Sequence, residues 1–166
     1  MPSLAELSAL VQALQGQSQA PATTGLRGST LADLIKQPNS YYGYQVRDPY
    51  PTEHSYFSAN PHVAGMAAED GKITFNPFSP PNVNRDAVGA NEAARLWMRE
   101  NNFAPKFDVT PAQAAQFEGS PYQSNPDAMR QTIIGRILSN DPSAGNVTDH
   151  QRQISDWVHE TLKARK

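Results

Sequence analysis

The sequence contains no cysteine and no long apolar run. Without cysteine the chain can have no disulfide framework, no thiolate nucleophile and no cysteine-based zinc site, so its stability must come from packing. Its apolar runs are far shorter than the roughly 20 residues that a membrane span needs. Near the N-terminus, Glu6 stands where a signal peptide carries basic residues. We therefore expect a soluble protein that is not secreted.

An excess of either charge sign is also lacking, because the formal net charge is only -2 on 166 residues. Such a balance gives no electrostatic footprint for nucleic acid or anionic lipid, and neither partner is expected. Apolar residues make up 38% of the chain, below the roughly 45–50% of ordinary globular proteins. Proline is abundant instead, with 14 residues. The length suits one domain, and the composition indicates that part of the chain is extended or irregular.

Residues 1–60 are predicted to form an extended N-terminal arm. A capping box at Ser3 and apolar residues at helical spacing predict a helix over residues 4–15. A linker composition follows over residues 16–28, and a second short helix is predicted over residues 31–36. An isolated helix of this length is marginal in water. Its apolar stripe must therefore dock, either on another protein or on the chain's own core.

The last part of the arm, residues 38–61, holds four prolines and five of the six tyrosines. It follows neither helical nor strand periodicity, which predicts irregular or polyproline-II-like chain. So many rings are not left in water, and tyrosine is a frequent interface anchor, so the rings lie against another protein or over this chain's own core. The candidate interface residues of the arm are Leu4, Leu7, Val11, Leu14, Tyr41, Tyr42, Tyr44, Tyr50, Tyr56 and Phe57.

Residues 61–166 are predicted to form an α+β, mainly α-helical domain. Two apolar-leaning runs within residues 63–76 flank Asp70 and Gly71, which suit a type I′ turn, and they predict a β-hairpin. Four helices follow, because capping residues stand before four apolar periodic segments. The predicted caps are Asn82 or Asn84, then Thr110, Asn125 and Thr148.

The helical periodicity also predicts which side chains these helices bury. On the last of these four helices, His150 and His159 are expected to face water. On the first of the four, Glu92 is expected to form ordinary surface pairs with Arg95 and Arg99. The predicted buried residues are Val83, Ala87, Ala90, Ala94, Trp97 and Met98 on the first helix, Met129, Ile133, Ile134 and Ile137 on the third, and Ile154, Trp157, Val158 and Leu162 on the last.

Motifs for catalysis or metal binding are missing from the sequence. There is no HExxH, EF-hand, P-loop, GxGxxG or GxSxG pattern. His54 and His62 lie near acidic residues in the sequence, which would suit a metal site or an acid–base pair. We instead expect Asp70 to be a turn residue and Glu69 to be its solvent-exposed neighbour. We expect no enzyme activity, no catalytic residue, no metal and no cofactor.

Four stretches of the predicted domain carry a resemblance to known proteins. They are HVAGMAAEDGKITFNPFS at 62–79, NEAARLWMRE at 91–100, FDVTPAQAAQFEGSPYQSNPDAMRQTI at 107–133 and RILSNDPSAG at 136–145. Residues 61–143, about half of the chain, resemble small virion-associated structural proteins, largely uncharacterised, of short-tailed bacteriophages. The resemblance implies a structural role and brings no catalytic residue with it. The first 60 residues take no part in it.

The arm and the resemblance together lead us to expect a structural protein of the virion, made in the host cytoplasm and present in several copies. Its arm would bind portal, tail or capsid proteins, in the tail or head-to-tail region. Capsid decoration is an alternative, and so is an internal or ejected protein that contacts the host envelope, although the helix at 4–15 lacks the basic residues of surface-seeking helices. A hydrolase would need a carboxylate pair, for which the candidates are Glu53, Glu69, Asp70, Glu92 and Glu100.

Overall fold

The structure, a computed structural model, describes residues 39–165. The predicted helices at 4–15 and 31–36 and the linker at 16–28 lie outside these residues, and so do the interface candidates Leu4, Leu7, Val11 and Leu14. The described part is an α+β fold, mainly α-helical, as the sequence predicts. It contains five α-helices and one four-stranded sheet.

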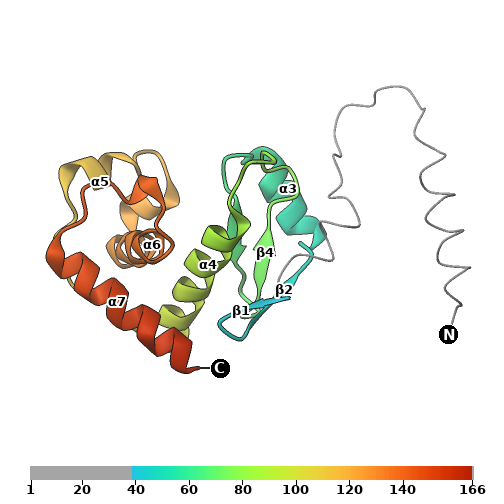
Figure 1. The fold of residues 1–166 in the computed structure, drawn as a ribbon. Coiled ribbons are helices and arrows are strands. Elements are labelled where there is room, and N and C mark those ends of the chain that lie inside the picture. Colours follow the sequence, from blue (N-terminus) through green and yellow to red (C-terminus); the bar gives the residue numbers. More distant parts are fainter. Residues whose placement is uncertain (1–38, 166) are drawn as a thin grey trace, which may run out of the picture.

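The four strands are short and lie in the order β1-β2-β4-β3 (Figure 1). Strands β1 (Ser40–Tyr41) and β2 (Tyr44–Arg47) pair antiparallel, as do β3 (Gly65–Ala67) and β4 (Ile73–Phe75). The two hairpins are joined in the middle of the sheet, where β2 runs parallel to β4. The predicted hairpin within residues 63–76 is therefore confirmed.

The turn type predicted for that hairpin is wrong. A type I′ turn needs positive φ at both central residues, but only Gly71 has it, with φ 76°, and Asp70 does not. The first hairpin has this feature instead, because Tyr42 and Gly43 have φ values of 50° and 82° between the paired residues Tyr41 and Tyr44. A tyrosine with positive φ is uncommon, which is why the sequence gives no turn signal there.

The helices after residue 61 begin where the sequence predicts. They are α4 (Arg85–Glu100), α5 (Pro111–Ala115), α6 (Pro126–Leu138) and α7 (Asp149–Ala164), and two 3₁₀ turns, Pro121–Ser124 and Pro142–Ala144, precede α6 and α7. Each of these four α-helices has a cap whose side-chain oxygen accepts a hydrogen bond from the backbone N–H three residues later. The four caps are Asn84, Thr110, Asn125 and Thr148.

The predicted irregular segment 38–61 is wrong over the residues that the structure describes. It forms β1, β2 and a fifth helix, α3 (Pro51–Ala59). Val46 of β2 pairs with Ile73 of β4, so this segment is part of the same sheet as the later hairpin. Tertiary pairing overrides the weak local pattern of a proline-rich segment, and residues 39–60 belong to the folded domain, not to an arm.

Helix α4 lies between the sheet and the group formed by α5, α6 and α7 (Figure 1). It buries Leu96, Trp97 and Met98 in one core that reaches from Tyr41 and the sheet to α6 and α7. The predicted core residues of α6 are confirmed: Met129, Ile133, Ile134 and Ile137. For the first predicted helix the prediction is partly wrong, because Val83 lies before α4 and is only half-buried, as are Ala87 and Ala90 on α4. On α7, Ile154 is half-buried and Trp157 is exposed.

Candidate protein-binding surface

Three of the six described interface candidates, Tyr41, Tyr44 and Phe57, are buried inside the domain. The Tyr41 hydroxyl donates a hydrogen bond to Asp86 at 3.1 Å, and the Tyr44 hydroxyl donates one to Glu100 at 2.8 Å. Burial and these carboxylate neighbours raise the pKa of both phenols. The assignment of these three rings to an interface is therefore wrong, because the chain's own core takes them up.

Tyr42 is half-buried and joins the first hairpin to α7. Its hydroxyl lies 2.9 Å from Nε2 of His159, and the two rings meet edge to face at 5.7 Å. The prediction that His159 simply faces water is therefore wrong. This contact brings the start of the described chain next to the second half of α7.

Tyr50 and Tyr56 remain available at the surface, 52% and 43% exposed. Tyr50 lies under the Arg47 guanidinium, whose carbon is 3.7 Å from the ring centroid. Tyr56 projects from α3, whose buried side is formed by Phe57. Of the six described interface candidates, these two are the ones still exposed enough to serve as anchors.

Arg47 binds Glu53 and Asp70, two of the carboxylates that had suggested a metal or acid–base site with His54. Its guanidinium makes a two-pronged pair with Glu53, at 2.7 and 2.8 Å, and its Nε donates to Asp70 at 2.7 Å. The hydrogen bond from Arg47 is the main reason that the pKa of Glu53 and the pKa of Asp70 both lie below their usual values. Through Arg47, these two carboxylates link β2 to α3 and to the second hairpin, so they stabilise the fold.

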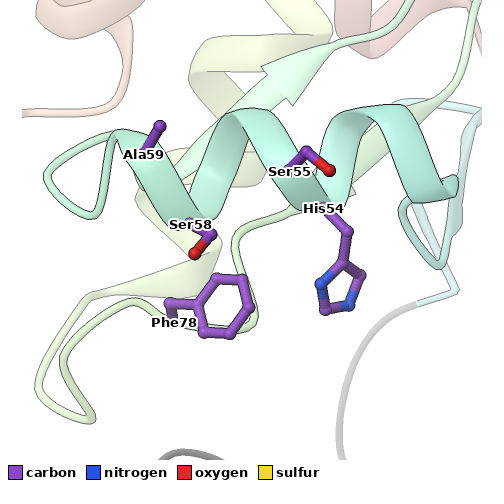
Figure 2. A pocket seen from close by; sticks show the side chains of 5 residues that line it. All are labelled: His54, Ser55, Ser58, Ala59 and Phe78. Carbon is purple, nitrogen blue, oxygen red and sulfur yellow. The ribbon is translucent and has the colours of Figure 1, made fainter.

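Beside α3 the described surface has an open pocket, in which Phe78 faces the helix (Figure 2). The ring of Phe78 meets the imidazole of His54 edge to face at 5.1 Å. Ser55, Ser58 and Ala59 complete the lining. The pocket therefore presents a phenyl ring and an imidazole beside two serines and one alanine.

The largest exposed ring of the described chain belongs to α7. Trp157 is 52% exposed, and its ring packs against Trp97 of α4 at 5.5 Å and against Phe103 at 5.1 Å. Trp97 and Phe103 are themselves 5.8 Å apart, so the three rings form one cluster, which we call the aromatic patch. Exposed aromatic groups of this kind are typical of protein interfaces.

The periodicity of α7 placed Trp157 in the core because it stands between Ile154 and Val158. Neighbouring positions on a helix are about 100° apart, so two of them are buried together only where the helix is covered on two sides, as Trp97 and Met98 of α4 are. Periodicity alone could not decide whether α7 is covered in this way at Trp157. Val158 and Leu162 are the fully buried ones. Phe103 was missed because it follows α4 in a turn and has no periodic pattern around it.

Glu92 and Arg95 are not the surface pair that the sequence suggests. The Glu92 side chain is 5% exposed and lies 3.1 Å from Arg95. The other Arg95 nitrogen donates to the Tyr122 hydroxyl at 2.9 Å, which joins α4 to the turn before α6. Arg99 instead donates to backbone carbonyls of the second hairpin. These groups hold elements together and leave no free acid–base pair there.

Residues 39–165 contain no group of three or more His, Asp or Glu side chains that could hold a metal ion. Within the same residues no helix has the length and apolar character needed to cross a membrane. Comparison of the chain with protein-family models, with curated proteins and with solved structures finds no match. Among the described residues, the aromatic patch presents the largest exposed aromatic side chain, Trp157.

Proposed function

We propose that this protein is a noncatalytic structural component of a bacteriophage particle, bound to other virion proteins in the tail or head-to-tail region through residues 1–38. The observation that carries the proposal is the position of the apolar stripe Leu4, Leu7, Val11 and Leu14. A linker composition over residues 16–28 separates this stripe from a domain whose first strand starts at Ser40. A stripe so placed serves attachment.

The described structure shortens the proposed arm. Residues 39–60 supply β1, β2 and α3 and bury Tyr41, Tyr44 and Phe57. Attachment by these rings would require the domain to unfold in part. The binding role therefore passes to residues 1–38, with the exposed aromatic patch as a second contact surface on the domain.

The phage setting rests on the resemblance of residues 61–143, which run from the approach to β3 to the turn before α7. That stretch supplies α4 and α6, the centre of the fold. The resemblance therefore concerns the body of the domain, while the arm is argued from its own residues. Several copies per particle, bound to portal, tail or capsid proteins, is the arrangement that both features support.

The test is a deletion of residues 1–38 in the phage gene. Residues 39–165 carry the described core, so the shortened protein should fold but should be lost from purified particles, as measured by quantitative mass spectrometry. A deletion to residue 60 would not be informative, because it also removes β1, β2 and α3.

A full-length pair of variants provides the matched comparison. Leu7→Asp with Val11→Asp places two charges on the stripe, whereas Ser8→Asp with Gln12→Asp places two charges beside it. Incorporation should fall for the first variant and persist for the second. Equal incorporation of the shortened, stripe and control variants would refute attachment through the arm, and particle density at side-chain resolution would separate the tail region from capsid decoration.

A further inference from the structure

We infer that in the free protein the apolar stripe of the arm docks on the aromatic patch of its own chain. This goes beyond the proposed function, because it concerns the protein before assembly and not its partner in the particle. The docked arm would keep both apolar surfaces out of water until a neighbouring protein competes for the stripe.

The aromatic patch is only partly covered by the described residues. Trp157 exposes about half of its surface although two rings pack against it. Ile154, one turn earlier on α7, is half-buried and extends the apolar surface along the helix. An aliphatic side chain laid over the exposed part of this ring would remove apolar surface from water, which is favourable.

The stripe has the chemistry of a suitable occupant. It consists of leucine and valine at helical spacing, on a segment without lysine or arginine. A helix of this length gains most of its stability from docking its apolar face. Aliphatic side chains of an amphipathic helix laid over aromatic rings are a recurrent mode of recognition.

The stripe can reach the patch. Residues 15–38 provide 24 residues of chain between Leu14 and the domain. The linker at 16–28, as a flexible coil, spans about 20 Å, and the predicted helix at 31–36 adds about 9 Å. A domain of this size has a radius of gyration of about 14 Å. The described chain starts beside α7, because Tyr42 contacts His159.

The same chain is a better host than a second copy at ordinary concentrations. A short tether holds its end at an effective concentration of the order of millimolar, whereas a second copy in dilute solution is present at micromolar concentration. Docking on a second copy becomes favourable only where copies are crowded together, as they are in an assembled particle.

Tryptophan fluorescence of the full chain tests the inference, because the protein has only Trp97 and Trp157. In a Trp97→Phe background, Trp157 should be quenched severalfold less by acrylamide than in the same background with Leu7→Asp and Val11→Asp. The shielding should not change between roughly 1 and 50 μM protein, well below the effective concentration of the tether. A Trp157→Phe background, which reports Trp97, should show no response to the stripe variant.

Cysteine pairing gives a second readout that keeps both tryptophans. The chain has no cysteine, so Ser8→Cys with Gln153→Cys, beside the stripe and one turn before Trp157, can be oxidised without interference. A bridged monomer is expected, and Ser8→Cys with Ser58→Cys on α3 should stay unbridged. Equal quenching with and without the stripe, no bridge, or bridged dimers alone would overturn docking on the same chain. None of these results bears on particle incorporation, which tests the proposed function separately.

Discussion

Gln113 and Gln151 hydrogen-bond to each other through both of their amide groups, at 3.1 and 3.0 Å, and both side chains are fully buried. Each glutamine also closes the capping box of its own helix, by accepting from the backbone N–H of Thr110 or of Thr148. The two helix starts of α5 and α7 are thus locked to each other by the residues that cap them.

We predict that Gln113→Ala lowers the free energy of unfolding by about 2–3 kcal/mol, because it leaves a cavity and removes a partner from the buried Gln151 amide. Urea unfolding followed by circular dichroism measures this. Gln153→Ala, at an exposed position of α7 two residues after Gln151, should change stability by less than about 0.5 kcal/mol.

Combining Gln113→Ala with Gln151→Ala gives the coupling between the two side chains. The double variant should lose less than the sum of the single losses, by about 1 kcal/mol or more, because the second substitution removes an amide whose partner is already gone. Strict additivity would show that the two amides act independently, in spite of their reciprocal bonds.

The close contact of α4 with the first hairpin requires glycine at position 89. A Cβ atom there would overlap Cε2 and Cζ of the Tyr41 ring. Alanine favours helix over glycine by about 1 kcal/mol, but displacing the buried ring should outweigh this. We predict that Gly89→Ala destabilises the protein by about 1–3 kcal/mol.

The neighbouring position supplies the control for this prediction. Ala90→Gly, on the same helix and only half-buried, should also destabilise, by about 1 kcal/mol, through helix propensity alone. If Gly89→Ala instead stabilised the protein in thermal and urea unfolding, the Tyr41 ring would not be held against α4 in the way that the structure has it.

Helix starts could be predicted from the sequence because they depend on residues within one turn. Asn84, Thr110, Asn125 and Thr148 all stand next to the N–H groups that they cap, so no distant partner is needed. The second hairpin was predictable for the same reason, since its strands and its turn are contiguous.

The elements that were missed depend on distant partners. Strand β2 is held by β4, more than twenty residues away, through the pairs formed by Val46 and Arg47. Tyr41 and Tyr44 look like free anchors until Asp86 and Glu100 are placed beside them. The aromatic patch combines α7, α4 and the turn after α4, so no local pattern could reveal it.

Acid should weaken the junction formed by Arg47, Glu53 and Asp70. The pKa of Glu53 in the folded protein lies below its unfolded value, chiefly because of the hydrogen bond from Arg47. A lowered pKa contributes stability above the unfolded pKa, near 4.3 for glutamate, and that stability is lost as pH falls through the folded pKa. The pKa of Asp70 shifts in the same direction for the same reason.

We therefore predict that Glu53→Gln destabilises the protein most above about pH 5 and progressively less below about pH 4. Free energies of unfolding measured in urea at several pH values test this. Glu118→Gln, at an exposed position, should parallel the parent protein throughout. A difference between Glu53→Gln and the parent that stays constant with pH would mean that Glu53 is not paired in the folded state.

The buried pair formed by Glu92 and Arg95 gives the last prediction. The Glu92 side chain is 5% exposed and that of Arg95 is 21% exposed, so Glu92→Gln leaves the Arg95 charge without its carboxylate at a site that is only partly open to water. Breaking a buried pair in this way costs about 3–5 kcal/mol, whereas replacing both partners by apolar residues is often neutral. We expect a loss near the lower end, about 3 kcal/mol, because Arg95 keeps its bond to Tyr122.

The double variant Glu92→Met with Arg95→Met should recover most of that loss, to within about 1 kcal/mol of the parent in urea unfolding. Glu160 and Lys163 form a pair of the same spacing at the surface of α7, 2.9 Å apart, and Glu160→Gln should leave the urea midpoint unchanged. If Glu92→Gln had as little effect as Glu160→Gln, solvent would reach the pair. The junction between α4 and the turn before α6 would then be looser than the contact of Arg95 with Tyr122 implies.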